Sequence, residues 1–593
     1  MGTQGPTSIP FPLSSFPGAT PQESAGRIIN CYAEPLGDPS QSGVGAPKDA
    51  IVWRRVPGLT QHTMTAQSGY RGGLIVNNLS IEVFNNTAIT VDVSGNVVVL
   101  GSLPGTKKIS IARNQNTNLA YPDVLIVDQD NGAFSVQLPG GAPVALNTVG
   151  AVPQAFSVSF QDGYFFLTIA DGRVFASPIN NITPANWNAL TFVTIQAKSD
   201  VSLFRGIAYQ GYMFFFTSGS CEVWSDAAAA APLFPYTRSA VLTTGLIQPS
   251  AIAGFETGFD NLFWVSQDFG VWNLPPNSLQ PVKVSPPDLD RLIEASVTSG
   301  DTLEAGVHIF AGKKYWTVQS STWSWQFNVG TQKWNERSSR LVTGLPGRWR
   351  GVGGHPAFGK WMGGDTQTGA IVYIDDTNYN DVTTQSLGTF ITTWAPMMMR
   401  MESGAVDKFP YRARVARADF HYVRGTGVAG VTAPVQAILS AANSGVGLVR
   451  LTVAKTLGYQ DGDQVVVAGM VGTTEGNGTW VINVVDATHI DLLGSVFVHA
   501  FVSGGTITDV TPAPANLLDP AVAISWSDDG GQNWFGPVLR SLGPQSIIKT
   551  GRVSVKNTGL TGVQGRRWRM DISAAVYTAF LKATQSDDPT EVS

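Results

Sequence analysis

Residues 212–226 read YMFFFTSGSCEVWSD, and this stretch decides the fold class. A run of large apolar side chains, a Thr-Ser-Gly-Ser segment and a second apolar run are typical of two antiparallel strands joined by a turn. Helical periodicity is nearly absent from the rest of the chain, and short apolar runs bounded by Gly, Asn, Asp and Pro recur throughout. We therefore predict an all-β protein.

The strand pair belongs to a repeat. Similar strand cores begin near Leu74, Val124, Tyr164, Tyr212, Leu262, Lys314 and Lys360, at intervals of 40 to 52 residues. From the third onward, each core is followed by a turn and a second strand. A sheet of about four strands in each ~40–50 residues is what a β-propeller blade requires, because blades bury their faces only against neighbouring blades. The spacing predicts a propeller of six or seven blades over residues 61–385; stacked β-sandwiches are the structural alternative.

The flanking regions differ from the repeat. In residues 286–297, PPDLDRLIEASV, four apolar side chains share one helical face, which predicts a short helix decorating the propeller. Beyond residue 385 we expect a C-terminal β-sandwich domain built from residues 386–426 and 513–583. A small inserted β module is expected over residues 427–512, an N-terminal arm that docks a ring or adaptor over residues 1–60, and a flexible tail over residues 584–593.

Composition bounds the function. Charged residues make up 14% of the 593, below the ~25% of an ordinary soluble domain, which suggests a surface covered by other subunits. The net charge of −5 argues against a general nucleic-acid binder. Cys31 and Cys221 are too few for a disulfide framework and are expected to be ordinary thiols. With no apolar run of about 18 residues and no signal-like N-terminus, we expect a soluble protein without a membrane span.

One motif raises the question of catalysis. The stretch SWSDDGGQNW, residues 525–534, places Ser527, Asp529, Gly531 and Trp534 in the S-x-D-x-G-x-x-W box that recurs in sialidases. Asp-Asp-Gly-Gly is also a hairpin-turn sequence, and the arginine cluster, tyrosine nucleophile and acid that a sialidase needs cannot be assigned from spacing. We expect a turn and no catalytic residues.

Cofactor and metal motifs are equally weak. Gly425, Gly427 and Gly430 have GxGxxG spacing, but Val-Thr-Ala-Pro follows where a dinucleotide site needs a helix, so we expect a linker and no cofactor. The six histidines form no metal-ligand grouping, which predicts no metal site.

Two further sets of residues leave alternatives open. Trp316, Trp323, Trp325 and Trp334 could stack on sugars, although blade cores use the same residues. Basic side chains gather near Arg412, Arg414, Arg417 and Arg424, and again at Arg566, Arg567 and Arg569. Arg412 and Arg414 lie two residues apart, on one face of a strand, and could face solvent, a protein partner or DNA.

Several short motifs, in order, resemble the tail accessory proteins of short-tailed bacteriophages, called packaged-DNA stabilisation, tail hub or nozzle proteins. The resemblance begins with GRIINCYAEPLGD (26–38) and WRRVPGLT (53–60). It continues through PVKVSPPDLDRLIEA (281–295) and RWRGVGGHPAFGKWMGGDTQTGAIVYID (348–375), and ends with SWSDDGGQNW and RRWRMDIS (566–573). The region 427–512 departs from the family pattern and resembles a β module inserted in many phage structural proteins.

This resemblance implies a non-catalytic structural virion protein. It would form a homohexameric ring below the portal and adaptor, extend the DNA channel, retain the packaged genome and allow its ejection. Implied partners are copies of itself, portal and adaptor proteins, tail fibre or spike and needle proteins, and DNA that passes without sequence readout. The implied location is the virion tail, assembled in the host cytoplasm.

The resemblance also assigns contact residues. The opening motif nominates Arg27, Asn30, Tyr32, Glu34, Pro57 and Gly58 for contacts with other subunits or the adaptor, beside Arg412 and Arg414 from the strand pattern. From the net charge we expect a mildly acidic channel wall. The alternative function is a carbohydrate-active propeller, either a sialidase-like hydrolase or a glycan-binding tail component.

Overall fold

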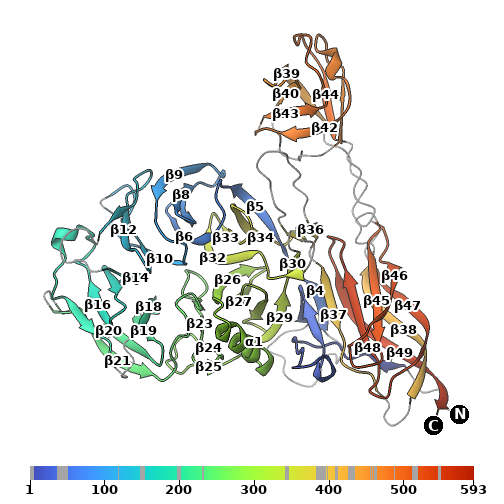
Figure 1. The fold of residues 1–593 in the computed structure, drawn as a ribbon, viewed down its shortest axis with the longest axis horizontal. Coiled ribbons are helices and arrows are strands. Elements are labelled where there is room, and N and C mark those ends of the chain that lie inside the picture. The colour runs from blue at the N-terminus through green and yellow to red at the C-terminus, as the bar shows by residue number, and fades with distance from the viewer. Residues whose placement is uncertain are drawn as a thin grey trace.

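The computed structural model consists almost entirely of strands (Figure 1). It describes residues 6–36, 51–117, 119–146, 154–196, 202–229, 233–340, 346–381, 395–396, 398–407, 412–424, 435–454, 456, 459, 464–486, 488–509, 519–544 and 549–592. The linker prediction for Gly425, Gly427 and Gly430 lies outside these residues.

In the described residues, seven antiparallel four-stranded blades form a ring, six as separate sheets and one as part of a larger sheet, which confirms the predicted propeller and fixes its blade number (Figure 1). The first three blades are β6 (Tyr70–Val76), β7 (Leu79–Phe84), β8 (Thr87–Val91), β9 (Val97–Ser102); β10 (Ile109–Arg113), β11 (Val124–Asp128), β12 (Gly132–Val136), β13 (Val144–Ala145); and β14 (Ser157–Gln161), β15 (Tyr164–Thr168), β16 (Arg173–Ala176), β17 (Phe192–Thr194). The next three are β18 (Leu203–Tyr209), β19 (Tyr212–Thr217), β20 (Cys221–Asp226), β21 (Tyr236–Leu242); β22 (Ile252–Ala253), β23 (Leu262–Val265), β24 (Val271–Leu274), β25 (Val282–Lys283); and β26 (Glu304–Phe310), β27 (Lys313–Gln319), β28 (Ser324–Asn328), β29 (Lys333–Arg337). The seventh is β32 (Gly351–Ala357), β33 (Lys360–Asp365), β34 (Ala370–Asp375) and β5 (Gly58–Met64).

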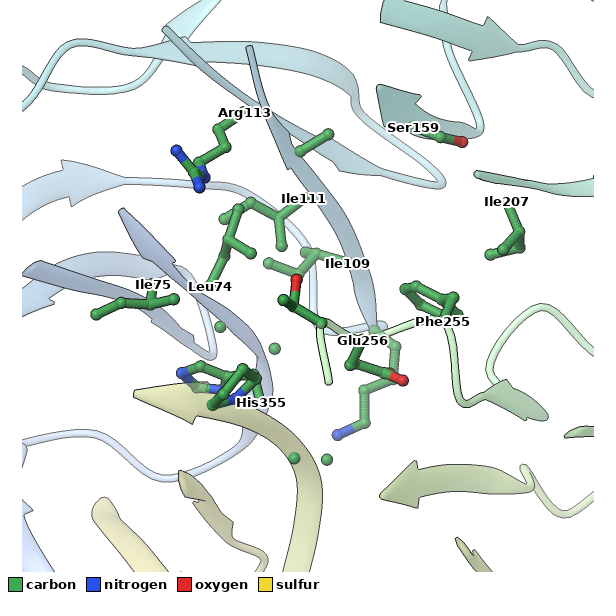
Figure 2. A pocket seen from close by; sticks show the side chains of 18 of the residues that line it. Leu74, Ile75, Ile109, Ile111, Arg113, Ser159, Ile207, Phe255, Glu256 and His355 are labelled. Carbon is green, nitrogen blue, oxygen red and sulfur yellow. The ribbon is translucent and has the colours of Figure 1, made fainter. Parts of the chain in front are cut away.

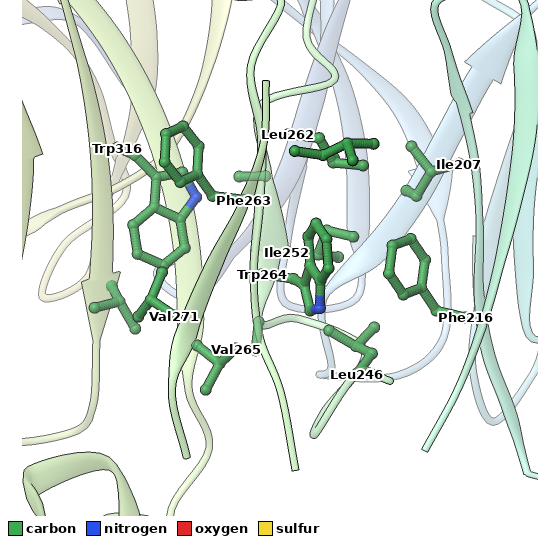
Figure 3. Packing of buried hydrophobic residues seen from close by; sticks show 14 of the residues in the cluster. Ile207, Phe216, Leu246, Ile252, Leu262, Phe263, Trp264, Val265, Val271 and Trp316 are labelled. Atoms are coloured by element: carbon green, nitrogen blue, oxygen red, sulfur yellow. The ribbon is translucent and has the colours of Figure 1, made fainter. Parts of the chain in front are cut away.

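The aromatic run of β19 explains how blades hold together. Successive side chains of a strand point to opposite faces, so Phe214 and Phe216 pack toward the fifth blade while Met213 and Phe215 pack toward the third. Figure 3 shows Phe216 against Trp264 of β23, with ring centroids 5.3 Å apart. Because each buried aromatic side chain contributes about 1.5–3 kcal/mol, a strand buried on both faces is held by both neighbours.

The periodic strand cores fall at a fixed place in the blade. Six of the seven predicted cores lie in or at the start of the second strand, and the strands that follow them are third strands. The first core is the exception, since Leu74 lies in the innermost strand β6 and the matching second strand is β7. The glycine pair Gly72–Gly73 breaks up β6, which leaves LIV as its most strand-like part.

The seventh blade closes the ring with a strand from the N-terminal region. β5 pairs antiparallel with β34, with Leu59 opposite Ile374, and forms the outermost strand of this sheet. The closing strand therefore begins at Gly58, before the predicted start at residue 61.

The C-terminal region is a β-sandwich, as predicted. One sheet has the strand order β3 (Cys31–Pro35), β4 (Ile51–Arg55), β49 (Ala579–Val592), β38 (Arg412–Arg424) and β47 (Lys549–Leu560), with β1 (Thr7–Ser8) also paired to β49. The facing sheet contains β2 (Arg27–Ile29), β37 (Met399–Glu402), β48 (Arg567–Ile572), β45 (Ala521–Ser527) and β46 (Phe535–Ser541). Phe420 and Phe580 from the first sheet pack with Trp568 and Met570 from the second in one core.

Two boundary predictions are wrong. The described N-terminal residues, 6–36 and 51–60, form no separate arm, because β1 to β4 are strands of the sandwich and Ile9, Ile28 and Trp53 lie in its core. Residues 584–592 are no flexible tail, because they continue β49, whose backbone pairs with β38. Their polar side chains suggested a tail, but backbone hydrogen bonds hold a strand whatever its side chains are.

Propeller and sandwich share one sheet. β2 pairs parallel to β29 of the sixth blade, with Ile29 opposite Glu336, and antiparallel to β37 of the sandwich. The result is a continuous nine-stranded sheet from β26 to β46. Strand pairing therefore joins the two domains.

Two smaller elements complete the fold. The predicted helix is present as α1 (Pro287–Thr298), with Leu289 and Ile293 buried. The inserted module is a closed barrel of β39 (Val435–Asn443), β40 (Val449–Val453), β43 (His489–Leu493), β42 (Gly478–Val484), β41 (Gln464–Ala468) and β44 (Thr506–Asp509), which stands apart from both domains in Figure 1. None of the helices in the described ranges is long and apolar enough to cross a membrane.

Candidate functional site: the junction of propeller and sandwich

The residues nominated by the opening motif gather where β2 and β3 meet the sixth and seventh blades. Arg27 on β2 places its Nε 3.0 Å from Oε1 of Glu336 on β29. Burial alone would lower the pKa of Arg27, but the Glu336 carboxylate raises it above its ordinary value. A cavity of about 320 Å³ opens beside this pair and is also lined by Asn30 and Arg400.

Asn30 links three segments of the chain. Its side-chain amide donates to the carbonyl oxygens of Ser338 (2.7 Å) and Met398 (3.0 Å), and its Oδ1 accepts from the Ser338 backbone at 3.1 Å. The Asn30 backbone has φ of 55°, a left-handed conformation that asparagine tolerates better than most residues. Ser338 follows the sixth blade and Met398 precedes β37, so this one side chain bridges both domains.

Tyr32 and Glu34 on β3 contact the propeller directly. The Tyr32 ring packs edge-on against Phe310 (6.0 Å between centroids) and Tyr315 (6.1 Å) of the sixth blade. Glu34 forms ion pairs with Arg54 on β4 and Lys313 on β27. Burial raises the pKa of Glu34, but the two cations outweigh burial and hold it below its usual value.

Pro57 precedes the closing strand β5, and Gly58 is its first residue. The Pro57 carbonyl accepts a hydrogen bond from buried Arg337 at 3.3 Å, and the Gly58 backbone donates to Asn378 at 2.6 Å. A Cβ on Gly58 would lie 2.2 Å from the carbonyl oxygen of Asn380, so no larger residue fits there.

All six residues therefore make contacts within one chain, and their contacts with other subunits or the adaptor stay a prediction. Arg412 and Arg414 lie elsewhere, exposed on β38. The Arg412 Nε donates to the Thr561 carbonyl at 2.8 Å, and Arg414 lies opposite Leu560 on one side and Asp588 on the other.

Sequence reasoning missed a set of buried ion pairs. Arg71 of the first blade pairs with Asp128 of the second at 2.5 Å, and both side chains are at most 1% exposed. Arg350 pairs with Asp365 inside the seventh blade, with 2.9 Å between Nε and Oδ1. Asp128 ends the apolar run VLIVD, and an acidic residue at the end of a buried strand is the sequence feature that could have predicted a buried ion pair. Breaking such a pair by removing one partner typically costs about 3–5 kcal/mol.

The propeller axis holds a cavity of about 610 Å³ (Figure 2). Its wall is mostly apolar and includes Leu74, Ile75, Ile109, Ile111, Ile207 and Phe255. Glu256 and Arg205 supply polar groups. Burial raises the pKa of Glu256 to about 7, while a 2.6 Å hydrogen bond from the Gly254 backbone and the charge of Arg205 act against the shift.

Next to this cavity, Ser80, His355 and Glu82 approach one another without forming a catalytic triad. Nε2 of His355 lies 3.0 Å from the Ser80 hydroxyl and 3.1 Å from a Glu82 oxygen. In a triad the carboxylate holds the other ring nitrogen, so that Nε2 is free to take the serine proton. Here both partners share Nε2, and Ser80 is fully buried.

The sialidase-like box builds a turn between β45 and β46. The Ser527 hydroxyl donates to Asp529 at 2.7 Å and accepts from the Gly531 backbone at 2.8 Å. Asp529 also accepts from the Asn533 backbone at 2.9 Å. These bonds hold the pKa of Asp529 near 2 against the effect of burial, so it would not carry a proton as a general acid.

The remaining candidates are structural too. Trp316, Trp325 and Trp334 are at most 3% exposed in the blade core, and Trp323 is half-buried. Arg566 and Arg567 are buried, and Arg566 pairs with Asp528 at 2.8 Å, while Arg569 lies over the Trp534 ring. Both cysteines are buried free thiols. Within the described ranges no cluster of His, Cys, Asp and Glu could hold a metal ion.

Comparison with known proteins matches the propeller. The family model "Bacteriophage P22 Gp10, beta-propeller" covers residues 48–379, more than half of the chain. No curated protein matches the sequence.

Solved propellers resemble the chain weakly. The WD40 propeller domain of Doa1 has 8% identity and a TM-score of 0.34, covering 54% of this chain and 97% of its own. The WD40 domain of Toxoplasma gondii coronin has 11% identity and a TM-score of 0.33, covering 62% of this chain and 87% of its own. The fold assignment rests on the blade pairing and the family match, since likeness at these scores carries no argument.

Proposed function

The chain belongs to the phage stabilisation family defined by the β-propeller of bacteriophage P22 Gp10, and from this premise we propose that its copies close into a ring below the portal and adaptor. Members of this family are tail components of the virion that stabilise packaged DNA. In the proposal the ring has six copies, extends the DNA channel, retains the genome and releases it at ejection, without catalysis.

The family match over the propeller is the observation that carries the proposal. The low fraction of charged residues agrees with it, because a surface poor in charge suits extensive contacts between copies. Contacts between unlike surfaces form a ring when their rotation closes.

The junction residues take a defined part in this proposal. Arg27, Asn30, Tyr32 and Glu34 fix the angle between propeller and sandwich within each copy, so that every copy presents the same wedge to the ring. Arg412 and Arg414 remain exposed and keep their proposed role at a contact with a partner. Portal, adaptor, fibre or spike and needle proteins are the proposed partners.

Native mass spectrometry and electron microscopy of the purified chain, alone and mixed with the portal and adaptor complex, test the proposal. Discrete rings seated on the portal are expected. Solitary protomers without affinity for the portal complex would contradict it. A chain in which a short Gly-Ser linker replaces residues 435–509 is the matched control, since ring formation is assigned to the propeller and sandwich.

The carbohydrate-active alternative has lost its supporting residues. The tryptophans nominated for sugar stacking belong mainly to the blade core, and Asp529 is committed to its turn. We expect no turnover of a fluorogenic sialoside by the intact chain. Turnover that disappears in Asp529→Asn would reinstate the alternative.

A further inference from the structure

The outer face of the six-stranded sheet of the sandwich carries a group of cations. Arg417 and His421 on β38, Arg552 and Lys556 on β47 and Lys582 on β49 project from it, and we call this surface the basic face. Neighbouring residues of these strands, such as Phe420, Val553 and Ala583, point the other way into the core. The alternation of a β-strand thus separates an apolar inner face from a basic outer one.

Strand register sets the cations on a grid. Arg417 lies opposite Lys556, and His421 lies opposite both Arg552 and Lys582. Paired strands are about 4.8 Å apart, and alternate residues along a strand are about 6.7 Å apart. The basic face is therefore an array of positive groups on three neighbouring strands, at about these spacings.

Within the strand segments that carry these cations, one carboxylate opposes their charge, and Asp588 lies further along β49, opposite Arg414. In segments 417–421, 552–556 and 580–586 the single acid is Asp419. It accepts hydrogen bonds from Arg417 (2.7 Å) and Ser554 (2.5 Å), and its side chain is only 13% exposed. Lys556 and Lys582 are exposed and form no ion pair with any described residue. Four cations against one acid give a local charge of +3 in a chain whose net charge is −5.

The pKa of His421 is lowered on this face. Burial is the first cause that lowers its pKa, and the nearby charges of Lys582 and Arg552 lower it further. Asp419 acts in the opposite direction but does not restore the ordinary value.

We propose that the basic face binds the phosphate backbone of double-stranded DNA without reading its sequence. Lysine, arginine and hydroxyl side chains are the usual phosphate contacts, and Ser554, Thr584 and Ser586 supply hydroxyls on this face. In the three segments the imidazole of His421 is the only outward aromatic ring, and no Phe, Tyr or Trp points outward as a platform for an unpaired base, which favours duplex over single-stranded DNA.

The composition of the basic face disfavours a protein partner. Protein interfaces are depleted in lysine and serine and depend on buried apolar or aromatic anchors. Here lysine, serine and threonine surround the arginines, and the apolar side chains are turned inward. The choice of DNA as the polyanion rests on the proposed function. The charge pattern of the basic face is independent of that proposal. In this proposal the surface that meets DNA is basic, in contrast to the mildly acidic channel wall expected from the net charge.

Fluorescence anisotropy with a labelled 30-base-pair duplex, measured across 50–200 mM salt, tests the inference on the isolated full chain. Four cations that contact phosphates predict a slope of log K against log salt of about −3 to −4. The triple variant Arg552→Gln, Lys556→Gln, Lys582→Gln should bind at least ~10-fold more weakly and bring the slope to about −1. Binding should not depend on the duplex sequence.

Two matched variants separate charge from folding. Lys107→Gln, Lys333→Gln, Lys360→Gln removes three exposed cations from the propeller and should leave binding unchanged. Arg552→Lys, Lys556→Arg, Lys582→Arg keeps the charge and should keep binding. Thermal unfolding of each variant checks that the sandwich is intact.

Equal affinity of wild type and the Gln triple variant, or an equal loss in the propeller control, would overturn the inference. Tighter binding to poly-glutamate than to the duplex would indicate an acidic protein partner for the basic face and would also overturn the inference. Duplex binding by a chain that forms no ring on the portal would instead contradict the proposed function and support the basic face.

Discussion

Replacing Asn30 with alanine should uncouple the propeller from the sandwich. The wild-type side chain makes three hydrogen bonds that join residues following the sixth blade to residues preceding β37. Asn30 is 1% exposed, so bulk solvent does not reach these bonds, and only water in the adjoining cavity of about 320 Å³ could replace part of them. Alanine leaves two carbonyl oxygens and one backbone N–H without their partner.

The expected cost follows from these groups. Leaving a buried polar group unsatisfied costs about 1–3 kcal/mol, and relaxation of the junction recovers part of the sum over three groups. Alanine in a left-handed conformation adds about 1 kcal/mol. We expect a loss of about 3–5 kcal/mol in the free energy that couples the domains, and a midpoint lower by roughly 5 °C.

Differential scanning calorimetry is the appropriate measurement, because a chain of several domains need not unfold in two states. The wild type should unfold its propeller and sandwich in one transition, and Asn30→Ala should resolve two. Asn30→Gly is the matched control, since it keeps the backbone conformation and should recover about 1 kcal/mol of the loss. A single transition at the wild-type midpoint in Asn30→Ala would refute the assigned role of this side chain.

Three further predictions concern other parts of the molecule. Folding raises the pKa of Glu256 from 4.5 to about 7, so its contribution to stability is present below pH 4.5 and is lost as pH rises through 7. Glu256→Gln should therefore stabilise the propeller at pH 8 by about 1–3 kcal/mol, after allowance for cavity water. Denaturant unfolding that shows no gain over wild type at pH 8 would contradict this prediction. Burial raises the pKa of Cys31 and Cys221, so the native chain at pH 8 should resist a thiol reagent that labels both residues in denaturant, and rapid native labelling would show that they are accessible. Val435 and Thr508 pair with each other, so the two ends of the barrel segment lie side by side and a short linker can replace residues 435–509. This replacement should leave the midpoint of the main calorimetric transition within about 2 °C of the wild-type value. A larger shift would show that the barrel stabilises the other domains.

The sequence revealed the parts of the propeller that are buried on both faces. Second strands such as β19 are nearly continuous apolar runs, and third strands such as β20 are buried over most of their length, because neighbouring blades cover each of their faces. First and fourth strands carry a weaker signal. β22 has only two residues, and the outermost β21 exposes most of its side chains. The closing strand β5 lay beyond any local pattern, since its partner is about 310 residues away in sequence.

The opening motif identified residues that contact other parts of the same chain, and the expected contacts with other subunits stay a prediction. Arg27, Tyr32 and Glu34 were nominated for contacts between subunits, and the structure pairs them with Glu336, Phe310 and Lys313 of the same chain. Ion pairs and edge-on rings have the same chemistry within a chain and between chains. Sequence motifs can therefore identify contact residues, whereas only the three-dimensional pairing decides which surface they meet.

The N-terminal segment explains why the domains form a unit. Between residues 7 and 64 it supplies strands to both sheets of the sandwich and the closing strand of the seventh blade. β4 and β1 pair with β49, the last strand, so the sandwich is complete only when both ends of the chain have met. Such distant pairing delays closure, because loop entropy must be overcome before the contacts form. The basic face depends on β38, β47 and β49, so a chain lacking β49 would lose it together with the sandwich, and only copies with both domains closed would offer that surface to a partner.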